Sequence, residues 1–164
     1  MSANPRFQII RGLPGSGKST AAKRYDCLHL ELDQYCVRGG AYRWGVKRDA
    51  DARVWVCRVA RIALHARIDL VLAGVIPCAD PVLEHLVADA LKEGYEVWIA
   101  DLEAAHENRH GVRPQDYERF ASKFVSADML VASVPDLETL QADGRLRFGL
   151  MPEALDLIPE EDGK

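Results

Sequence analysis

The 164-residue sequence contains no uncharged run long enough to cross a bilayer. Arg6 interrupts the N-terminal stretch before a signal-like apolar core could form, so we expect no targeting segment and no membrane partner. There is also no internal repeat and no low-complexity tract. These absences exclude membrane and repeat architectures, and the length favours one domain with a sizeable core.

The sequence also lacks cysteine or histidine patterns that would hold a metal or a disulfide framework. Cys27, Cys36, Cys57 and Cys78 form no C-x-x-C pair, so we expect reduced, partly buried thiols. The net charge of −4 argues weakly against a general polyanion binder. The charge is uneven, however, because residues 38–67 carry eight Lys or Arg and two Asp, whereas the chain from Asp136 onward is acidic.

One stretch fills every fixed position of the phosphate-binding P-loop pattern, with Gly12, Gly17, Lys18 and Ser19 in place. It follows an apolar run and precedes a helix-forming run, which is the context that the pattern requires. Glycines let backbone N–H groups converge on an anion, the lysine carries charge to phosphates, and the serine hydroxyl is the expected Mg²⁺ ligand. We therefore predict nucleotide binding by Gly12, Pro14, Gly15, Ser16, Gly17, Lys18, Ser19 and Thr20.

Strands and helices are predicted to alternate along the chain. Strands are expected over 6–11, 27–32, 69–75, 95–100 and, at an edge, 145–150; helices over 18–24, 48–67, 80–94, 114–125 and 135–142. This order predicts an α/β fold, a three-layer P-loop sandwich with four to five parallel strands and helices on both faces. We expect one domain over residues 1–150 with a small helical lid at about 102–119, then an acidic flexible tail over 151–164.

A lone aspartate, Asp33, ends the second predicted strand and should lie on the same sheet edge as the P-loop. The sequence has no Asn-Lys-x-Asp guanine-reading motif and no D-x-x-G switch, so a small kinase is favoured over a GTPase or a motor. Asp33 could accept the proton of an acceptor alcohol, while Lys18 and a mobile arginine stabilise the transferring phosphoryl group. An alternative stays open, in which Asp33 caps the helix over residues 34–37.

Several motifs together resemble the small P-loop kinases related to phage polynucleotide kinase, the zeta-toxin type. The resemblance covers about residues 6–125 and rests on the P-loop, Asp33-x-Tyr35, Gly40-Ala41-Tyr42-Arg43-Trp44, Gly94-Tyr95-Glu96-Val97 and Asn108-Arg109-His110-Gly111-Val112. It implies transfer from ATP with Mg²⁺ to a hydroxyl, on a nucleic acid in characterised members. It also implies Asp33 as general base and a lid whose arginines close over ATP. Arg109 or Arg113 is the expected γ-phosphate contact, and a solvated helix charge is the alternative for each.

The sequence departs from that family at two places. Ala73-Gly74-Val75-Ile76 follows the third strand where the family often has Asn and Thr, so a polar contact to substrate or metal-bound water is missing or comes from elsewhere. Glu107 stands where several relatives have an arginine just before the lid asparagine. The altered third strand and the acidic net charge leave room for a small-molecule kinase. The altered third strand and Glu107 leave room for an ATP-binding regulatory module that has lost transfer activity.

The basic, aromatic segment suggests the acceptor. Arg38, Arg43, Lys47 and Arg48 could follow phosphates, and Tyr42 or Trp44 could stack on a base. The expected substrate-binding residues are therefore Tyr35, Arg38, Tyr42, Arg43 and Trp44, unless the aromatic rings are core anchors and the arginines a solvated face. A polynucleotide 5′-hydroxyl is the default acceptor, with DNA favoured over RNA. The hydroxymethyl group of 5-hydroxymethyluracil in phage DNA is the close alternative. Because four dispersed cysteines in a P-loop protein are expected to be reduced, we expect the protein in the cytoplasm of a bacterial or phage-infected cell.

Overall fold

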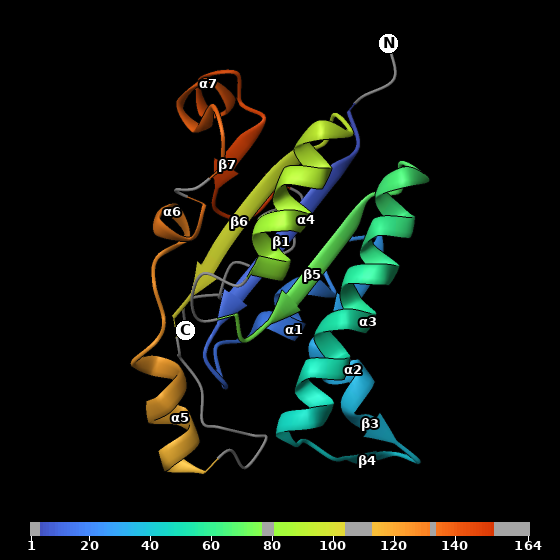
Figure 1. Ribbon diagram of the computed structural model, residues 1–164, viewed down its shortest axis with the longest axis vertical. Helices are drawn as coiled ribbons and strands as arrows, with labels where there is room; N and C mark the ends of the chain where they lie inside the picture. Colours follow the sequence, from blue (N-terminus) through green and yellow to red (C-terminus); the bar gives the residue numbers. More distant parts are fainter. Residues whose placement is uncertain (1–3, 77–80, 104–112, 132–133, 153–164) are drawn as a thin grey trace, which may run out of the picture.

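The computed structural model describes residues 4–76, 81–103, 113–131 and 134–152 (Figure 1). Its centre is a five-stranded parallel sheet in the order β2-β5-β1-β6-β7. These strands are β1 (Arg6–Gly12), β2 (Leu28–Glu31), β5 (Leu70–Gly74), β6 (Glu96–Leu102) and β7 (Leu146–Phe148). The helices are α1 (Lys18–Ala22), α2 (Leu32–Cys36), α3 (Val46–His65), α4 (Pro81–Lys92), α5 (Pro114–Ala121), α6 (Ala127–Leu130) and α7 (Leu137–Ala142). The predicted α/β fold is confirmed.

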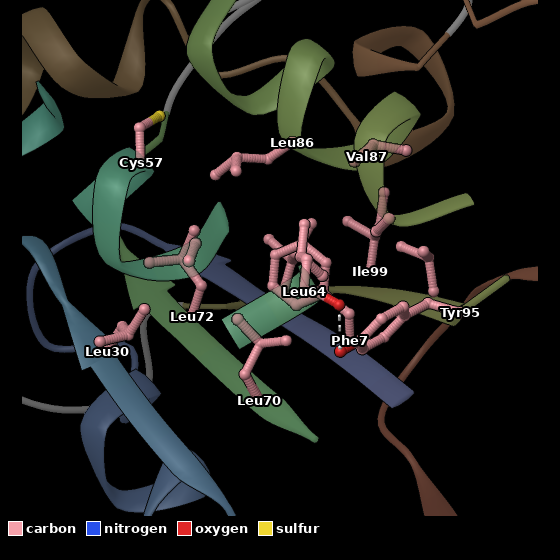
Figure 2. Close-up of a cluster of buried hydrophobic side chains, with 14 of the residues drawn as sticks. Phe7, Leu30, Cys57, Leu64, Leu70, Leu72, Leu86, Val87, Tyr95 and Ile99 are labelled. Carbon is pink, nitrogen blue, oxygen red and sulfur yellow. Dashed lines mark hydrogen bonds between the residues drawn. The ribbon is translucent and has the colours of Figure 1, made fainter. Parts of the chain in front are cut away.

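Two apolar clusters, one on each face of the sheet, explain the three layers. The larger cluster joins α3 and α4 to the sheet, and Figure 2 shows Leu64 and Leu86 directed toward Leu70 and Leu72. The smaller cluster packs Ala21, Ala22 and Tyr25 against Ile10, Val71 and Ala73. β5 is buried along its whole length, because a central parallel strand is covered by helices on both sides.

Several elements differ from the sequence predictions, and the differences near the P-loop edge affect the site. The second strand ends at Glu31, and Asp33 lies in the first turn of α2 rather than at the strand end. The capping alternative is also wrong, because Glu31 caps this helix in a reciprocal exchange with Gln34. The expected loop over 38–46 contains a hairpin of β3 (Val37–Arg38) and β4 (Ala41–Tyr42), and α6 was not predicted. Residues 104–112 of the predicted lid lie outside the described residues, as does the tail from residue 153, whereas the last residues of the lid belong to α5.

The cysteines that the structure describes lie in the core or next to it. Cys36 and Cys57 are buried and Cys27 is partly buried, as expected, whereas Cys78 lies outside the described residues. Within the described ranges no group of three or more His, Cys, Asp or Glu side chains could hold a metal ion. No helix in the part of the chain that the structure covers is long and apolar enough to span a bilayer.

Candidate active site

The P-loop forms the turn between β1 and α1, and its glycines are required by the backbone. Gly15 and Gly17 have φ angles of 86° and 81°, in the left-handed region that favours glycine. At Gly12 the reason is space, since a Cβ atom would lie 2.3 Å from Ser16 Oγ and 2.7 Å from the carbonyl oxygen of Leu102. Backbone conformation at Gly15 and Gly17, and lack of space at Gly12, therefore favour glycine at these three positions.

The polar groups of this loop fit a bound polyphosphate. Ser16 is buried, and its hydroxyl has no hydrogen-bond partner among the described residues, so the loop contains an unused donor. Lys18 Nζ donates a hydrogen bond to the carbonyl oxygen of Leu13 at 3.0 Å. Burial lowers the pKa of Lys18, while the negative charges of Asp33 and Glu31 act in the opposite direction and raise it. The ammonium group thus lies in a partly desolvated place close to two carboxylates.

Asp33 reaches this place because α2 begins directly after β2. The sheet edge that carries the P-loop also carries the carboxyl end of β2, so the first turn of α2 faces the loop. The Asp33 carboxylate accepts a hydrogen bond from the hydroxyl of Tyr42 at 3.0 Å. Tyr42 belongs to β4, so the hairpin contacts the predicted base directly.

A pocket of about 300 Å³ joins these elements. It is lined by Pro14, Lys18, Ser19, Leu32, Asp33, Tyr42, Trp44, Asp49, Arg53, Val75, Arg113, Asp116 and Phe120. In Figure 1 the P-loop, α5 and the β3–β4 hairpin lie at the same end of the molecule, where the central strands point. The pocket therefore brings together predicted residues from three separate segments: Lys18 and Ser19 of the P-loop, Asp33 with Tyr42 and Trp44, and Arg113.

Other predicted substrate residues lie elsewhere. The ring of Tyr35 packs against Trp55, with centroids 5.9 Å apart, and the guanidinium group of Arg38 lies over the Tyr35 ring. Arg43 is exposed, and its backbone N–H donates to the carbonyl oxygen of Cys36. None of these three residues lines the pocket. Arg109 lies outside the described residues.

Sequence analysis missed several pocket residues. Asp49 and Arg53 come from the first turns of α3 and form an ion pair at 3.0 Å, and Asp116 pairs with Arg113 at 2.8 Å. Their i,i+4 and i,i+3 spacings were visible in the sequence, but nothing in the pattern indicated that both helices begin at the P-loop edge. Each arginine that lines the pocket therefore carries an acidic neighbour of its own.

Comparisons with known proteins agree with this fold. No protein-family profile and no curated protein matches the sequence. The structure is similar to that of a candidate kinase from Chloroflexus aurantiacus, at a TM-score of 0.56 and 14% identity over 88% of this chain and 96% of that one. At this identity the likeness shows a shared fold and not a shared reaction.

Two other solved structures resemble this one less, with lower TM-scores. One is to the PezAT toxin–antitoxin system of Streptococcus pneumoniae, with a TM-score of 0.47 and 17% identity over 61% of this chain. The other is to the Pnkp1/Rnl/Hen1 RNA repair complex, with a TM-score of 0.47 and 16% identity over 87% of this chain. The chain spans 47% of the matched chain in each case, and neither likeness is high enough to bear on activity.

Proposed function

We propose that this protein is an ATP-dependent phosphotransferase that transfers the γ-phosphoryl group to a hydroxyl, with a nucleic acid as acceptor. One observation supports this most directly: Lys18 of the P-loop and Asp33 of α2 line the same pocket. Burial lowers the pKa of Lys18, and the two side chains are close enough for the Asp33 charge to oppose this shift. A phosphate-binding cation and a proton-accepting carboxylate thus face one space.

The residues of the pocket fit the chemistry of phosphoryl transfer. The P-loop and Lys18 would hold the phosphates, and Ser19 would be the protein ligand of Mg²⁺, which supplies charge neutralisation on the transferring group. Asp33 would accept the proton of the acceptor hydroxyl as the new O–P bond forms. The bond from the γ-phosphorus to its bridging oxygen breaks, and ADP leaves.

The surroundings of the pocket support a nucleic-acid acceptor. Tyr42 and Trp44 line it with rings that are about half exposed, and such rings are suited to stacking on bases. Arg43 and Lys47 are exposed and lie next to these two aromatic residues in the chain, so they could contact the phosphates of a nucleic-acid backbone. A polynucleotide 5′-hydroxyl is the default acceptor, and the hydroxymethyl group of 5-hydroxymethyluracil in DNA is the alternative.

A second candidate, transfer to a small alcohol, is favoured by the charge of the pocket. Its charged lining residues balance, with Lys18, Arg53 and Arg113 against Asp33, Asp49 and Asp116. A site built for a phosphate-rich polymer would be expected to carry excess positive charge. Apolar lining from Leu32, Val75 and Phe120 adds a surface that a neutral molecule could contact.

The experiment is a transfer assay with radiolabelled ATP and Mg²⁺. Single-stranded DNA and RNA oligonucleotides with a free 5′-hydroxyl, DNA containing hydroxymethyluracil, nucleosides and simple sugars are offered in parallel. Label on one of the oligonucleotides is the expected result and identifies the acceptor hydroxyl. Label on nucleosides or sugars alone would replace the nucleic-acid proposal by the small-alcohol one. ATP binding without transfer to any acceptor would favour the regulatory module.

A further inference from the structure

One hydroxyl already donates a hydrogen bond to the predicted base, and it belongs to the protein itself. The Tyr42 hydroxyl lies 3.0 Å from an oxygen of Asp33, and both side chains line the pocket that contains Lys18 and Ser19. An acceptor alcohol that is about to give its proton to Asp33 must make the same contact, an O–H donor at hydrogen-bond distance from the carboxylate. The tyrosine therefore imitates the acceptor.

The Tyr42 hydroxyl is protonated, which suits a group that occupies the acceptor position at Asp33 without reacting there. Burial raises the pKa of Tyr42, and the charge and hydrogen bond of Asp33 raise it further. The phenol consequently keeps its proton and remains a donor at physiological pH. Because a phenolate is disfavoured beside this carboxylate, Tyr42 is also a poor nucleophile.

The segment that carries Tyr42 is lightly attached to the protein. β3 and β4 have two residues each, and all four residues are exposed. Their turn is Gly39-Gly40, with φ angles of 58° and 75°, and no atom lies within 4 Å of a Cβ built at either glycine. A segment with little buried apolar surface opens at low cost in free energy. The hairpin can therefore release Asp33 when a competing donor arrives.

We propose, on the basis of the proposed function, that the Tyr42 hydroxyl holds the place of the acceptor hydroxyl at Asp33 until a bound acceptor displaces it. In this role Tyr42 makes the site discriminate between the hydroxyl of a bound acceptor and a free water molecule. A tethered phenol has a high effective concentration at Asp33, so a free water molecule competes with it poorly. An acceptor that also contacts Trp44 gains binding free energy with which to displace it. Wasteful hydrolysis of ATP is suppressed in the absence of acceptor.

The test uses Tyr42→Phe, which removes the hydroxyl and keeps the ring. We expect hydrolysis of ATP without acceptor to rise about tenfold, since the hydrogen bond that excludes water is lost. The KM for acceptor should fall several-fold, because the acceptor hydroxyl no longer has to displace the phenol. Tyr117→Phe is the matched control, because this α5 tyrosine does not line the pocket. In the double variant Asp33→Asn/Tyr42→Phe the gained hydrolysis should disappear.

Three results would overturn the placeholder role. Unchanged hydrolysis in Tyr42→Phe means that the phenol does not exclude water. A joint fall of hydrolysis and transfer means that Tyr42 aligns Asp33 instead. A phosphate found on Tyr42 by mass spectrometry after incubation with ATP means that the tyrosine is itself an acceptor. Failure of the proposed function looks different: wild type transfers to no acceptor while Tyr42→Phe still gains hydrolysis. If neither protein binds ATP, both proposals fall.

Discussion

Arg11 and Asp101 lie opposite each other on neighbouring strands, joined by two hydrogen bonds of 2.8 Å, and Arg11 has no exposed surface. The same guanidinium group donates to the carbonyl oxygens of Ile76 and Val125 and lies 4.8 Å from the ring centroid of Phe124. Arg11 directly precedes the P-loop. It therefore ties the start of the phosphate-binding turn to the ends of β6 and β5 and to the chain that follows α5.

Asp101→Asn should destabilise the fold strongly. It leaves the Arg11 charge buried without its counter-charge, and the expected loss in unfolding free energy is about 3 kcal/mol. Urea denaturation measures it. The matched control is Asp69→Asn, which breaks a pair with Arg6 at the other end of β1, where the side chains are 34% and 37% exposed. That variant should lose about 1 kcal/mol or less, because water takes over the released charge. Equal losses would show that burial does not govern these pairs.

Gly12→Ala should impair ATP binding. The added Cβ would meet Ser16 Oγ at 2.3 Å and a backbone oxygen of Leu102 at 2.7 Å, so the turn must move away from its present shape. Titration calorimetry should show the Kd for ATP rising by at least about tenfold. Gly45→Ala serves as control, since Gly45 has an extended backbone and nothing within 4 Å of the new atom. If both variants bind ATP like wild type, the tight packing of the turn is unimportant for binding.

Tyr95 makes stability dependent on pH above the neutral range. Burial raises the pKa of Tyr95 to about 12, and its hydroxyl lies 3.0 Å from the carbonyl oxygen of Ile68. Unfolding returns the pKa to about 10, so between these values the folded state binds more protons than the unfolded state. The free energy of unfolding should therefore fall from about pH 10 to about pH 12. Urea curves should show wild type more stable than Tyr95→Phe by about 1 kcal/mol at neutral pH. This difference should shrink and then reverse sign across that interval, because a shift of about two pKa units corresponds to roughly 2.7 kcal/mol. A constant difference would contradict the assignment.

The sequence predicted the parts of the site that local chemistry determines. Gly12, Gly17 and Lys18 are recognisable because the backbone of a phosphate-binding turn restricts residue types at fixed spacings. The sheet followed from alternating strands and helices, and it was enough to expect Asp33 at the P-loop edge. The start of α2 was misplaced because its cap is the exchange between Glu31 and Gln34, and glutamate is not a usual capping residue.

The rest of the site depends on distances that local patterns do not contain. Arg11 ends the predicted strand over 6–11, and its partner Asp101 became identifiable only from the register of β1 with β6. Asp49 and Asp116 reach the pocket because α3 and α5 both begin at the P-loop edge. Tyr35 and Trp44 lie close together in the sequence, and local pattern does not distinguish them. Only tertiary packing determines that the Tyr35 ring lies against Trp55 and that the Trp44 ring lines the pocket.

Asp33→Asn tests the predicted general base. The amide cannot accept the acceptor's proton, so turnover in the transfer assay should fall by on the order of 10²-fold or more. ATP binding measured by calorimetry should persist, because the P-loop is unchanged. Asp51→Asn removes the same charge from an exposed position of α3 outside the pocket and should retain full turnover. Undiminished turnover in Asp33→Asn would remove this residue as the base.

Trp44→Ala and Tyr35→Ala should separate acceptor binding from stability. Trp44 lines the pocket with 41% of its surface exposed, so its loss should raise the KM for an oligonucleotide acceptor by about tenfold and leave the melting temperature unchanged. Tyr35 packs against the core and Trp55, so its loss should lower the free energy of unfolding by about 2 kcal/mol and leave that KM unchanged. Steady-state transfer kinetics and thermal melts on both variants give the comparison. If Trp44→Ala changes stability alone, its ring is a core anchor, and the acceptor must be held by other residues of the pocket.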